Sequence, residues 1–247
     1  MKNILIFGAS GSIGNHIYNS FKLLDTNNII YGTTSKKSII NQESNNNESN
    51  NNESFNDKSN NYLYVNNDNL DNLKNINNLD IIVWCHGYNF NDNIFNFNEE
   101  EYMKIMNINI LFIIKTLNYL LANNKINDNA KMVIISSIWE DYTRDNKLSY
   151  SISKSALSGL VKNVAYDLSK KNILINNVLP GVIDNEMSRK TLKEEQINYI
   201  KNYLFFDRLV NLDDVFNTVK FLTIENTGIT GESIKVDLGF TKIKKYN

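Results

Sequence analysis

The sequence alternates short, β-branched apolar runs with longer helical patterns along most of its length. Most of these runs are continuously apolar, whereas a strand with one face in water would alternate apolar and polar residues. Strands that are buried on both faces and joined by helices form parallel sheets, so the sequence predicts a doubly wound α/β fold with seven strands, mainly parallel, and helices on both faces. The predicted strands cover residues 3–8, 28–34, 61–66, 80–87, 131–137, 173–181 and 233–239.

A single domain, residues 1–247, is expected, because this length fits one α/β core. Within it, residues 41–61 repeat the sequence NNNES and offer little apolar surface to bury, which predicts a flexible loop. The abundance of Asn, Lys and Ile is interpreted as the product of an AT-rich genome. An Asn-rich interaction site is the alternative.

Charge and cysteine content narrow the possible partners and the cellular location. The net charge is −1 with acids and bases interspersed, so neither nucleic acid nor an anionic membrane surface is an expected partner. The apolar segment 108–122 is interrupted by Lys115 and Asn118, and a buried helix is expected there, since a bilayer span needs about 20 apolar residues. Cys85 is the only cysteine, and the first residues lead directly into a strand rather than a signal peptide, so a cytoplasmic location is expected. No metal site is predicted.

A glycine-rich turn, GASGSIG at residues 8–14, follows the first predicted strand and leads into a helical pattern. Glycines let the backbone turn sharply and approach a pyrophosphate, whose charge is met by the N–H groups at the start of the helix. The spacing departs from the G-x-G-x-x-G fingerprint, and a glycine turn without a ligand is the alternative. The position between a strand and a helix favours a Rossmann-type dinucleotide site.

The end of the second predicted strand bears on the choice of cofactor. Residues 32–37, GTTSKK, contain no acid that would bind a free 2′-hydroxyl of the adenosine ribose. Hydroxyl and basic groups favour a 2′-phosphate, so NADP(H) is preferred through Thr34, Ser35 and Lys36, with NAD(H) possible. Lys36 and Lys37 as ordinary solvated charges are the alternative.

Tyr150 and Lys154 stand four residues apart in a predicted helix and therefore share one face. A free phenol with a pKa of about 10 is a poor acid–base group at neutral pH, and a nearby ammonium favours its phenolate. Ser137 ends a strand at the carboxyl edge of the sheet, where ligands of such sheets bind, and Asn109 belongs to a helix expected to lie beside Tyr150. A surface tyrosine packed on a lysine stem is the alternative for the pair alone, but its neighbours favour an active site.

With these residues, the chain resembles the short-chain dehydrogenase/reductase family in its single-domain branch, and within it the 3-oxoacyl-carrier-protein reductases and related carbonyl reductases. The resemblance extends from Lys2 to about Thr241. It rests on the order and spacing of Gly8 and Gly14, Asn109, Ser137, Tyr150 and Lys154, Pro180 and Gly181, and Ile229, Thr230 and Gly231.

The resemblance implies an NAD(P)-dependent oxidoreductase that transfers a hydride between a nicotinamide and a carbonyl or secondary alcohol. It implies that Tyr150 is the catalytic acid in reduction and the base in oxidation, and that Lys154 lowers the pKa of Tyr150 and holds the nicotinamide ribose. Ser137 would hydrogen-bond the substrate oxygen, and Asn109 would hold a water linked to Lys154. Relatives are often dimers or tetramers packed through the helices of Asn109 and Tyr150, so a homodimer or homotetramer is expected.

The resemblance also implies which residues hold the cofactor. The turn would bind phosphate and ribose, Asn66 and Asn67 the adenine, and Ile183 the carboxamide. The full predicted set is Gly8, Ala9, Ser10, Gly11, Ile13, Gly14, Thr34, Ser35, Lys36, Asn66, Asn67, Gly87, Tyr150, Lys154, Pro180, Gly181 and Ile183.

Two segments depart from the family pattern. WCHG at residues 84–87 replaces Asn-Asn-Ala-Gly, and His86 is interpreted as fixed by backbone hydrogen bonds, with a substrate contact as the alternative. Residues 138–149 are rich in charged and aromatic side chains where relatives commonly have small ones. If Glu140, Asp141, Arg144 and Lys147 line the pocket, they suit a polar or sugar-like substrate better than a 3-oxoacyl thioester; a solvated loop is the alternative.

Two other functions are considered. A nucleotide-binding regulatory protein with the same fold and no turnover is disfavoured, because a binder has no need of the Ser, Tyr, Lys and Asn set together. A sugar-nucleotide epimerase or dehydratase is suggested by the glycine spacing, but only 67 residues follow Pro180, which leaves little room for a further substrate domain.

Overall fold

A seven-stranded parallel sheet forms the centre of the computed structural model, which describes residues 1–35, 61–184, 195, 206 and 208–243. The strand order is β3-β2-β1-β4-β5-β6-β7, so the chain turns from one side of β1 to the other between β3 and β4. In such sheets ligands bind at this switch point, beyond the carboxyl ends of the strands. The predicted doubly wound α/β class is confirmed. The strands are β1 Asn3–Phe7, β2 Ile29–Thr34, β3 Asn61–Tyr64, β4 Leu79–Trp84, β5 Ile126–Ile135, β6 Leu174–Pro180 and β7 Ser233–Val236.

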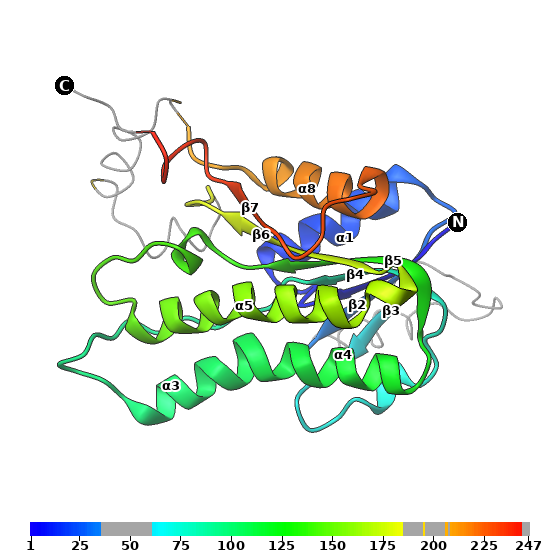
Figure 1. Ribbon diagram of the computed structural model, residues 1–247, viewed down its shortest axis with the longest axis horizontal. Coiled ribbons are helices and arrows are strands. Elements are labelled where there is room, and N and C mark those ends of the chain that lie inside the picture. Colours follow the sequence, from blue (N-terminus) through cyan, green and yellow to red (C-terminus); the bar gives the residue numbers. More distant parts are fainter. Residues whose placement is uncertain (36–60, 185–194, 196–205, 207, 244–247) are drawn as a thin grey trace, which may run out of the picture.

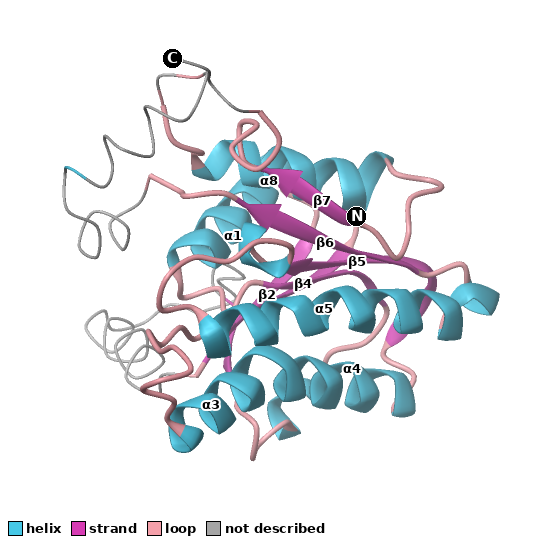
Figure 2. Cartoon of the chain, turned by 60° about the vertical axis from the view of Figure 1, so that its left-hand side comes forward, coloured by secondary structure: helices cyan, strands magenta, loops and turns pink. Residues whose placement is uncertain are grey.

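Helices cover both faces of the sheet, as Figures 1 and 2 show: α1 and α8 lie on one face, and α3, α4 and α5 on the other. The helices are α1 Ser12–Leu24, α3 Glu99–Met106, α4 Phe112–Ala122, α5 Leu148–Asp167 and α8 Leu212–Lys220. Successive side chains of a strand point to opposite faces. Ile4 and Ile6 of β1 accordingly belong to the core that includes residues of α1 and α8, and Leu5 and Phe7 to the core that includes residues of α4 and α5.

A π-helical turn, Asn107–Leu111, joins α3 and α4 into one helix from Glu99 to Ala122. Among the helices in the described part of the chain, this one is long and apolar enough to cross a membrane, as judged by length and composition alone. Phe112, Leu117 and Leu120 of this helix are nevertheless buried in the core beside the sheet. The apolar character of the segment is therefore explained by its place in the layer, as the sequence predicted.

β5 begins at Ile126, ahead of the predicted start at Lys131. The first half of the strand is polar, and its pairing with β4 shifts register between Leu79 and Ile81. Asn129, within the irregular stretch, has a φ of +64°. Polar residues and a bulge together remove the apolar run by which a strand is recognised.

Asparagine occupies most of the left-handed backbone positions. Six non-glycine residues in the described ranges have a positive φ, and five of them are asparagines. This region crowds the Cβ of most residues, while the short side chain of Asn can hydrogen-bond locally and tolerates it. The five are Asn78, Asn124, Asn129, Asn146 and Asn172.

The Asn-rich segment predicted as a loop falls almost entirely outside the described residues. Residues 41–60 and Lys36 lie there, and Asn61 already begins β3.

Candidate active site

Gly8 follows β1 and starts the turn that leads into α1. Its φ is +77°, and a Cβ at this position would lie 2.7 Å from the backbone nitrogen of His86. A Cβ on Gly14 would lie 2.3 Å from the carbonyl oxygen of Gly8, whereas one on Gly11 would meet nothing closer than 3.4 Å. Gly8 and Gly14 therefore allow the turn to pack closely against β4 and the start of α1, which a larger residue would prevent.

The N-terminus of α1 is suited to an anion. No side chain caps it, and its first turn carries no acidic residue. By contrast, α3 and α8 are each capped by an asparagine side chain and carry acids in their first turns. Uncapped N–H groups and the helix dipole attract negative charge, so this end of α1 fits a phosphate.

A cavity of about 390 Å³ opens beside this helix end, at the carboxyl edge of β1 to β4. It contains eight of the predicted cofactor residues, namely Gly8, Ser10, Gly11, Ile13, Ser35, Asn66, Asn67 and Gly87. Seven lining residues were not among the predicted set, namely Ser12, Thr33, Val65, Cys85, His86, Ile108 and Phe112. Most of the latter are apolar or ordinary in type, and only proximity in the fold identifies them.

Three more predicted cofactor residues, Ala9, Gly14 and Thr34, lie next to the cavity without lining it. The backbone nitrogen of Ala9 donates to the Thr33 carbonyl oxygen at 2.9 Å, and the Ser10 hydroxyl donates to Thr34 Oγ1 at 3.0 Å. Thr34 is only 1% exposed, and Gly14 packs on Gly8. These contacts join the glycine turn to the end of β2, where a dinucleotide fold holds the adenosine ribose.

Pro180, Gly181 and Ile183 lie at the carboxyl end of β6, outside the lining of this cavity. The Gly181 nitrogen donates to the Val236 carbonyl oxygen at 2.9 Å, and Ile183 forms a bridge with Val210. The structure thus separates these three from the predicted phosphate and adenosine residues, by the width of the sheet between β1 and β6.

Tyr150 and Lys154 lie one turn apart on α5, next to the end of β5. The Lys154 ammonium is 5.6 Å from the centre of the Tyr150 ring and donates to the Ile135 carbonyl oxygen at 3.2 Å. Ser137 follows β5 and hydrogen-bonds Tyr150. A Cβ on Gly87 would lie 3.8 Å from Lys154 Nζ and 3.7 Å from Asn109 Oδ1, so these two polar groups meet beside Gly87.

The sequence predicted a lowered pKa for Tyr150 beside Lys154, whereas in the structure the pKa of Tyr150 is raised. Burial raises the pKa of Tyr150 to about 12, and the hydrogen bond with Ser137 opposes the increase. Burial lowers the pKa of Lys154 to about 8, partly offset by the negative charge of Glu140. In the protein alone, loss of solvation therefore outweighs the effect that a neighbouring ammonium was expected to have on the phenol.

Asn109 lies on the π-helical turn and is 1% exposed. Its side-chain nitrogen donates to the Tyr88 carbonyl oxygen at 3.0 Å and to the Ser153 hydroxyl at 2.9 Å, while its Oδ1 accepts from the Tyr88 nitrogen at 2.7 Å. These bonds connect the helix, the segment after β4 and α5. Asn109 therefore fixes the position of the helix that carries Tyr150, in a turn type that is frequent at functional sites.

Two further residues hold the Tyr150 helix: Asp92, which no sequence pattern indicated, and Lys147, which the sequence suggested only as a pocket residue. Asp92 is fully buried and accepts from the backbone nitrogen of Ser149 at 3.0 Å and from the Ser149 hydroxyl. Lys147, 5.3 Å from the Tyr150 ring centre, donates to the side-chain oxygens of Asn89 and Asn91. Burial and the charge of Arg144 lower the pKa of Lys147 to about 8, against the opposing charge of Asp92.

Glu140, in the charged loop after β5, is buried and held by hydrogen bonds to three side chains. Glu140 is 6% exposed and accepts from Ser136 Oγ at 2.6 Å, from Asn177 Nδ2 at 3.1 Å and from the Ser233 hydroxyl. Burial raises the pKa of its carboxyl, and the three hydrogen bonds oppose this. Glu140 thus joins β5, β6 and β7, and its burial gives no support to the hypothesis that it lines a substrate pocket.

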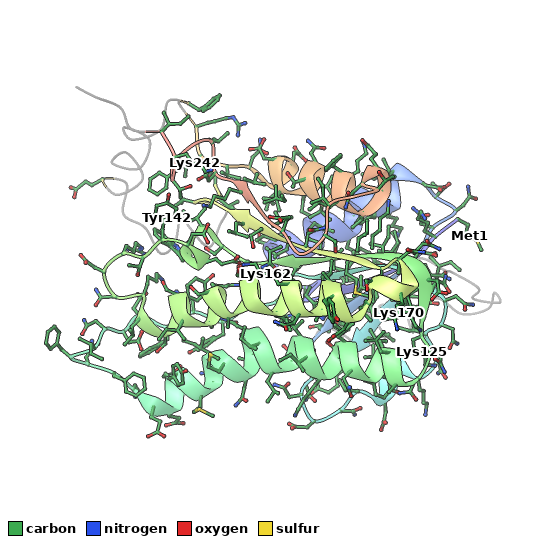
Figure 3. The ribbon with its side chains drawn as sticks, in the orientation of Figure 1. Met1, Lys125, Tyr142, Lys162, Lys170 and Lys242 are labelled. Carbon is green, nitrogen blue, oxygen red and sulfur yellow. The ribbon has the colours of Figure 1, made fainter. Side chains whose placement is uncertain are left out.

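The other charges of this loop are also partly neutralised. Asp141 pairs with Lys235 at 2.5 Å, and the Tyr142 hydroxyl donates to the Thr241 carbonyl oxygen at 2.6 Å. Figure 3 shows Tyr142 and Lys242 at the end of the molecule opposite Lys125 and Lys170. In the same orientation, the carboxyl ends of β6 and β7 in Figure 1 point to the side on which Figure 3 labels Tyr142.

Trp84, Cys85 and His86 of the WCHG segment were not predicted to be catalytic, and the structure shows what surrounds each of them. Trp84 is fully buried, stacks on Phe7 with ring centres 5.6 Å apart and donates from Nε1 to Thr116 Oγ1 at 3.0 Å. Burial raises the pKa of the Cys85 thiol well above its ordinary value, so it stays protonated. Neither ring nitrogen of His86 reaches hydrogen-bond geometry with a partner among the described residues, although the Ile108 backbone lies close enough to raise its pKa, so the interpretation of His86 as fixed by backbone hydrogen bonds stays a prediction.

A glycine turn, an uncapped helix and a parallel-sheet switch point define the class of dinucleotide-binding proteins. Comparison with known families gives the family itself. The family model described as "Enoyl-(Acyl carrier protein) reductase" matches residues 71–241. The chain belongs to the short-chain dehydrogenase/reductase family.

Individual relatives agree with this assignment. The chain is 31% identical over 164 residues to dehydrogenase/reductase SDR family member 4 of Sus scrofa, covering 65% of this chain and 59% of that protein. It is 28% identical over 251 residues to the 3-oxoacyl-[acyl-carrier-protein] reductase FabG of Rickettsia felis, covering 98% of both chains. The crystal structure of a gluconate 5-dehydrogenase from Burkholderia cenocepacia in complex with NADP and tartrate is similar in fold, with a TM-score of 0.80, 15% identity and coverage of 98% and 96%. Each of these proteins is named as a dehydrogenase or a reductase, and the chain spans about three fifths of the length of the first of them.

Proposed function

We propose that this protein is an NAD(P)-dependent oxidoreductase that interconverts a carbonyl and a secondary alcohol. The observation that carries the proposal is the meeting of Ser137, Tyr150, Lys154 and Asn109 at the carboxyl edge of the sheet, beside a glycine turn that fits a phosphate. One domain, residues 1–247, contains both parts.

The bound nicotinamide supplies the hydride chemistry, between its C4 and the substrate carbon. Tyr150 donates its phenolic proton to the substrate oxygen in reduction and accepts a proton from the alcohol in oxidation. Ser137 hydrogen-bonds the same oxygen and orients it. Lys154 carries the positive charge that holds the ribose hydroxyls and favours the phenolate, and Asn109 keeps α5 in place and holds a water that links Lys154 to solvent.

We further propose a preference for NADP(H). Thr34 and Ser35 end β2 next to the cavity, and no acid occurs between Gly32 and Lys37 to repel a 2′-phosphate. The gluconate 5-dehydrogenase of similar fold, which was crystallised in complex with NADP, supports this preference. Lys36 would add a positive charge there.

Two of the similar proteins favour different classes of substrate. The named activity of the Rickettsia relative favours a 3-oxoacyl thioester, and that relative matches along nearly all of both chains. The named activity of the gluconate 5-dehydrogenase favours a polar, sugar-like substrate. With Glu140 buried and Asp141 paired with Lys235, the loop after β5 gives less support to the polar class than its sequence suggested.

The protein is proposed to act in the cytoplasm as a homodimer or homotetramer. The cytoplasmic assignment is supported by the absence of any cysteine besides Cys85. The oligomer is supported by exposed apolar side chains on α4 and α5, which include Ile114, Ile152 and Tyr166.

The test of the proposed activity is the substitution Tyr150→Phe, which deletes one hydroxyl. Turnover of a panel of carbonyl substrates should fall at least a thousandfold, while the affinity for NADPH, followed by nicotinamide fluorescence, should change less than about threefold. Wild-type protein that binds neither NADPH nor NADH would overturn the proposal. Tighter binding of NADH than of NADPH would overturn the cofactor preference alone.

A further inference from the structure

Glu140 is a buried carboxyl group that takes part in none of the proposed reaction steps. It is 6% exposed, and its two oxygens accept hydrogen bonds from Ser136, Asn177 and Ser233. Removal of a carboxylate from water costs free energy unless hydrogen bonds and an opposite charge compensate it. Glu140 has the hydrogen bonds, but it forms no ion pair with any residue that the structure describes.

The backbone of Glu140 is bonded to both sides of the active site. Its nitrogen donates to the Ser137 carbonyl oxygen at 3.0 Å, and its carbonyl oxygen accepts from the Ser155 hydroxyl at 2.6 Å. Ser137 hydrogen-bonds Tyr150, and Ser155 follows Lys154 directly on α5. Glu140 is therefore fixed between the turn of the serine and the helix of the Tyr and Lys pair.

The carboxyl end of β5 holds the charged groups of Lys154 and Glu140 near each other. The Lys154 ammonium donates to the Ile135 carbonyl oxygen at 3.2 Å, and the next residue, Ser136, donates its hydroxyl to the Glu140 carboxyl at 2.6 Å. Lys154 is 3% exposed, and opposite charges attract more strongly in such a poorly solvated place than in water. Burial lowers the pKa of Lys154 to about 8, and the negative charge of Glu140 opposes this change.

The other titratable groups around Lys154 supply no negative charge at neutral pH. Tyr150 on α5 and His86 after β4 are both uncharged at pH 7, because their pKa values are about 12 and about 3. Lys147, which precedes α5 and lies 5.3 Å from the Tyr150 ring centre, is a second cation. Within the described part of the chain, Glu140 is thus the carboxylate whose charge acts on Lys154.

We propose that Glu140 is a positioning residue of the active site, the buried counter-charge that keeps Lys154 in its ammonium form. The inference rests on the proposed function and adds to it a residue that acts through Lys154. Burial raises the pKa of the Glu140 carboxyl, so its ionised form makes the folded protein less stable at neutral pH. A neutral side chain of the same shape would avoid this cost, and the benefit of the charge is to the reaction.

The test is Glu140→Gln, which removes the charge and keeps the shape. The glutamine can keep the hydrogen bonds, because a serine hydroxyl accepts as well as donates. The fall of kcat/KM for carbonyl reduction by NADPH, expected above pH 8 in wild type, should move to lower pH by about half a unit or more. At pH 6, where Lys154 is charged in both proteins, kcat/KM should stay within about threefold. The midpoint of thermal unfolding at pH 7 should equal or exceed that of wild type.

Asp141→Asn is the matched control, because it removes the adjacent carboxylate, which pairs with Lys235 at 2.5 Å. Its pH profile should match that of wild type. A shift of the same size in both variants would show that the effect is not specific to Glu140 and would overturn the inference.

Two other results would overturn the inference and leave the proposed function intact. One is an unchanged pH profile in Glu140→Gln. The other is a Glu140→Gln protein that does not fold, or that unfolds at a clearly lower temperature than wild type, since the carboxylate would then serve the structure. Wild-type protein that binds neither NADPH nor NADH, or that reduces no carbonyl of the panel, would instead overturn the proposed function and, with it, this inference.

Discussion

Single residues set how closely the backbone can approach a phosphate at the glycine turn. Of the three glycines there, Gly8 and Gly14 have no room for a Cβ, whereas Gly11 has. The sequence showed three glycines at regular spacing but could not rank them, because the atoms that exclude a side chain belong to other parts of the chain.

Gly14→Ala should therefore abolish measurable NADPH binding and lower the midpoint of thermal unfolding, since its Cβ would meet the Gly8 carbonyl at 2.3 Å. Gly228→Ala is the control and should keep NADPH affinity within about threefold, because a Cβ there would meet nothing within 4 Å and Gly228 is not among the residues that line the cavity. Fluorescence titration of both variants measures the difference. Equal effects of the two substitutions would contradict this account of the turn.

The pH dependence of reduction should follow Lys154. Its pKa is lowered from an ordinary 10.5 to about 8, so the ammonium is present at pH 7 and is lost as the pH rises through about 8. Tyr150, with a pKa of about 12, keeps the proton that reduction needs over this range. The value of kcat/KM for reduction should be level below pH 7 and fall above pH 8.

Lys147 has a similar pKa of about 8 and serves as the control for this profile. In Lys147→Met the fall above pH 8 should persist, because the titrating group is Lys154. A profile that becomes level in Lys147→Met would assign the titration to Lys147.

At the scale of elements, the start of α5 is held by a residue from a distant segment. Asp92 and Ser149 are 57 positions apart in the sequence, and no pattern connects them. The spacing of Tyr150 and Lys154 predicted that they share a face, but not what fixes the helix that carries them. Sequence periodicity indicates which face of an element is buried, but it does not indicate hydrogen bonds between elements.

Asp92→Ala should lower the free energy of unfolding by about 1–3 kcal/mol and reduce kcat, because both bonds to Ser149 are lost and Tyr150 follows directly. Ser149→Ala keeps the bond from its backbone nitrogen and should have the smaller effect on both. Urea unfolding and steady-state kinetics measure the two quantities. An Asp92→Ala protein as stable as wild type would show that α5 does not need this contact.

Elements were otherwise predicted best where they are uniformly apolar. β1 and β4 carry apolar runs with both faces covered, and the sequence located them within a few residues. The first half of β5 was missed because its polar residues lie at a register shift. The π-helical turn at Asn109 was also missed, since one extra residue in a helical turn leaves no mark in an apolar pattern.

At the scale of the whole molecule, the helical layer of α4 and α5 is the surface expected to join copies of the chain. Light scattering after size-exclusion chromatography should give two or four times the 28.5 kDa chain mass. A double variant, Ile114→Glu with Tyr166→Glu, should reduce that mass, because charge would be buried without a partner. Leu23→Glu is the control, as Leu23 is 85% exposed on α1 in the opposite layer. A wild-type protein of monomer mass would contradict the proposal.

The asparagines in left-handed turns have a consequence for how this chain tolerates change. An ordinary residue in that conformation costs about 1–2 kcal/mol, so replacing all five with alanine would cost on the order of 5–10 kcal/mol, comparable to the net stability of a domain. At these sites the backbone therefore tolerates asparagine or glycine but not an ordinary side chain. The stability of the fold thus depends on asparagines that lie outside its apolar core.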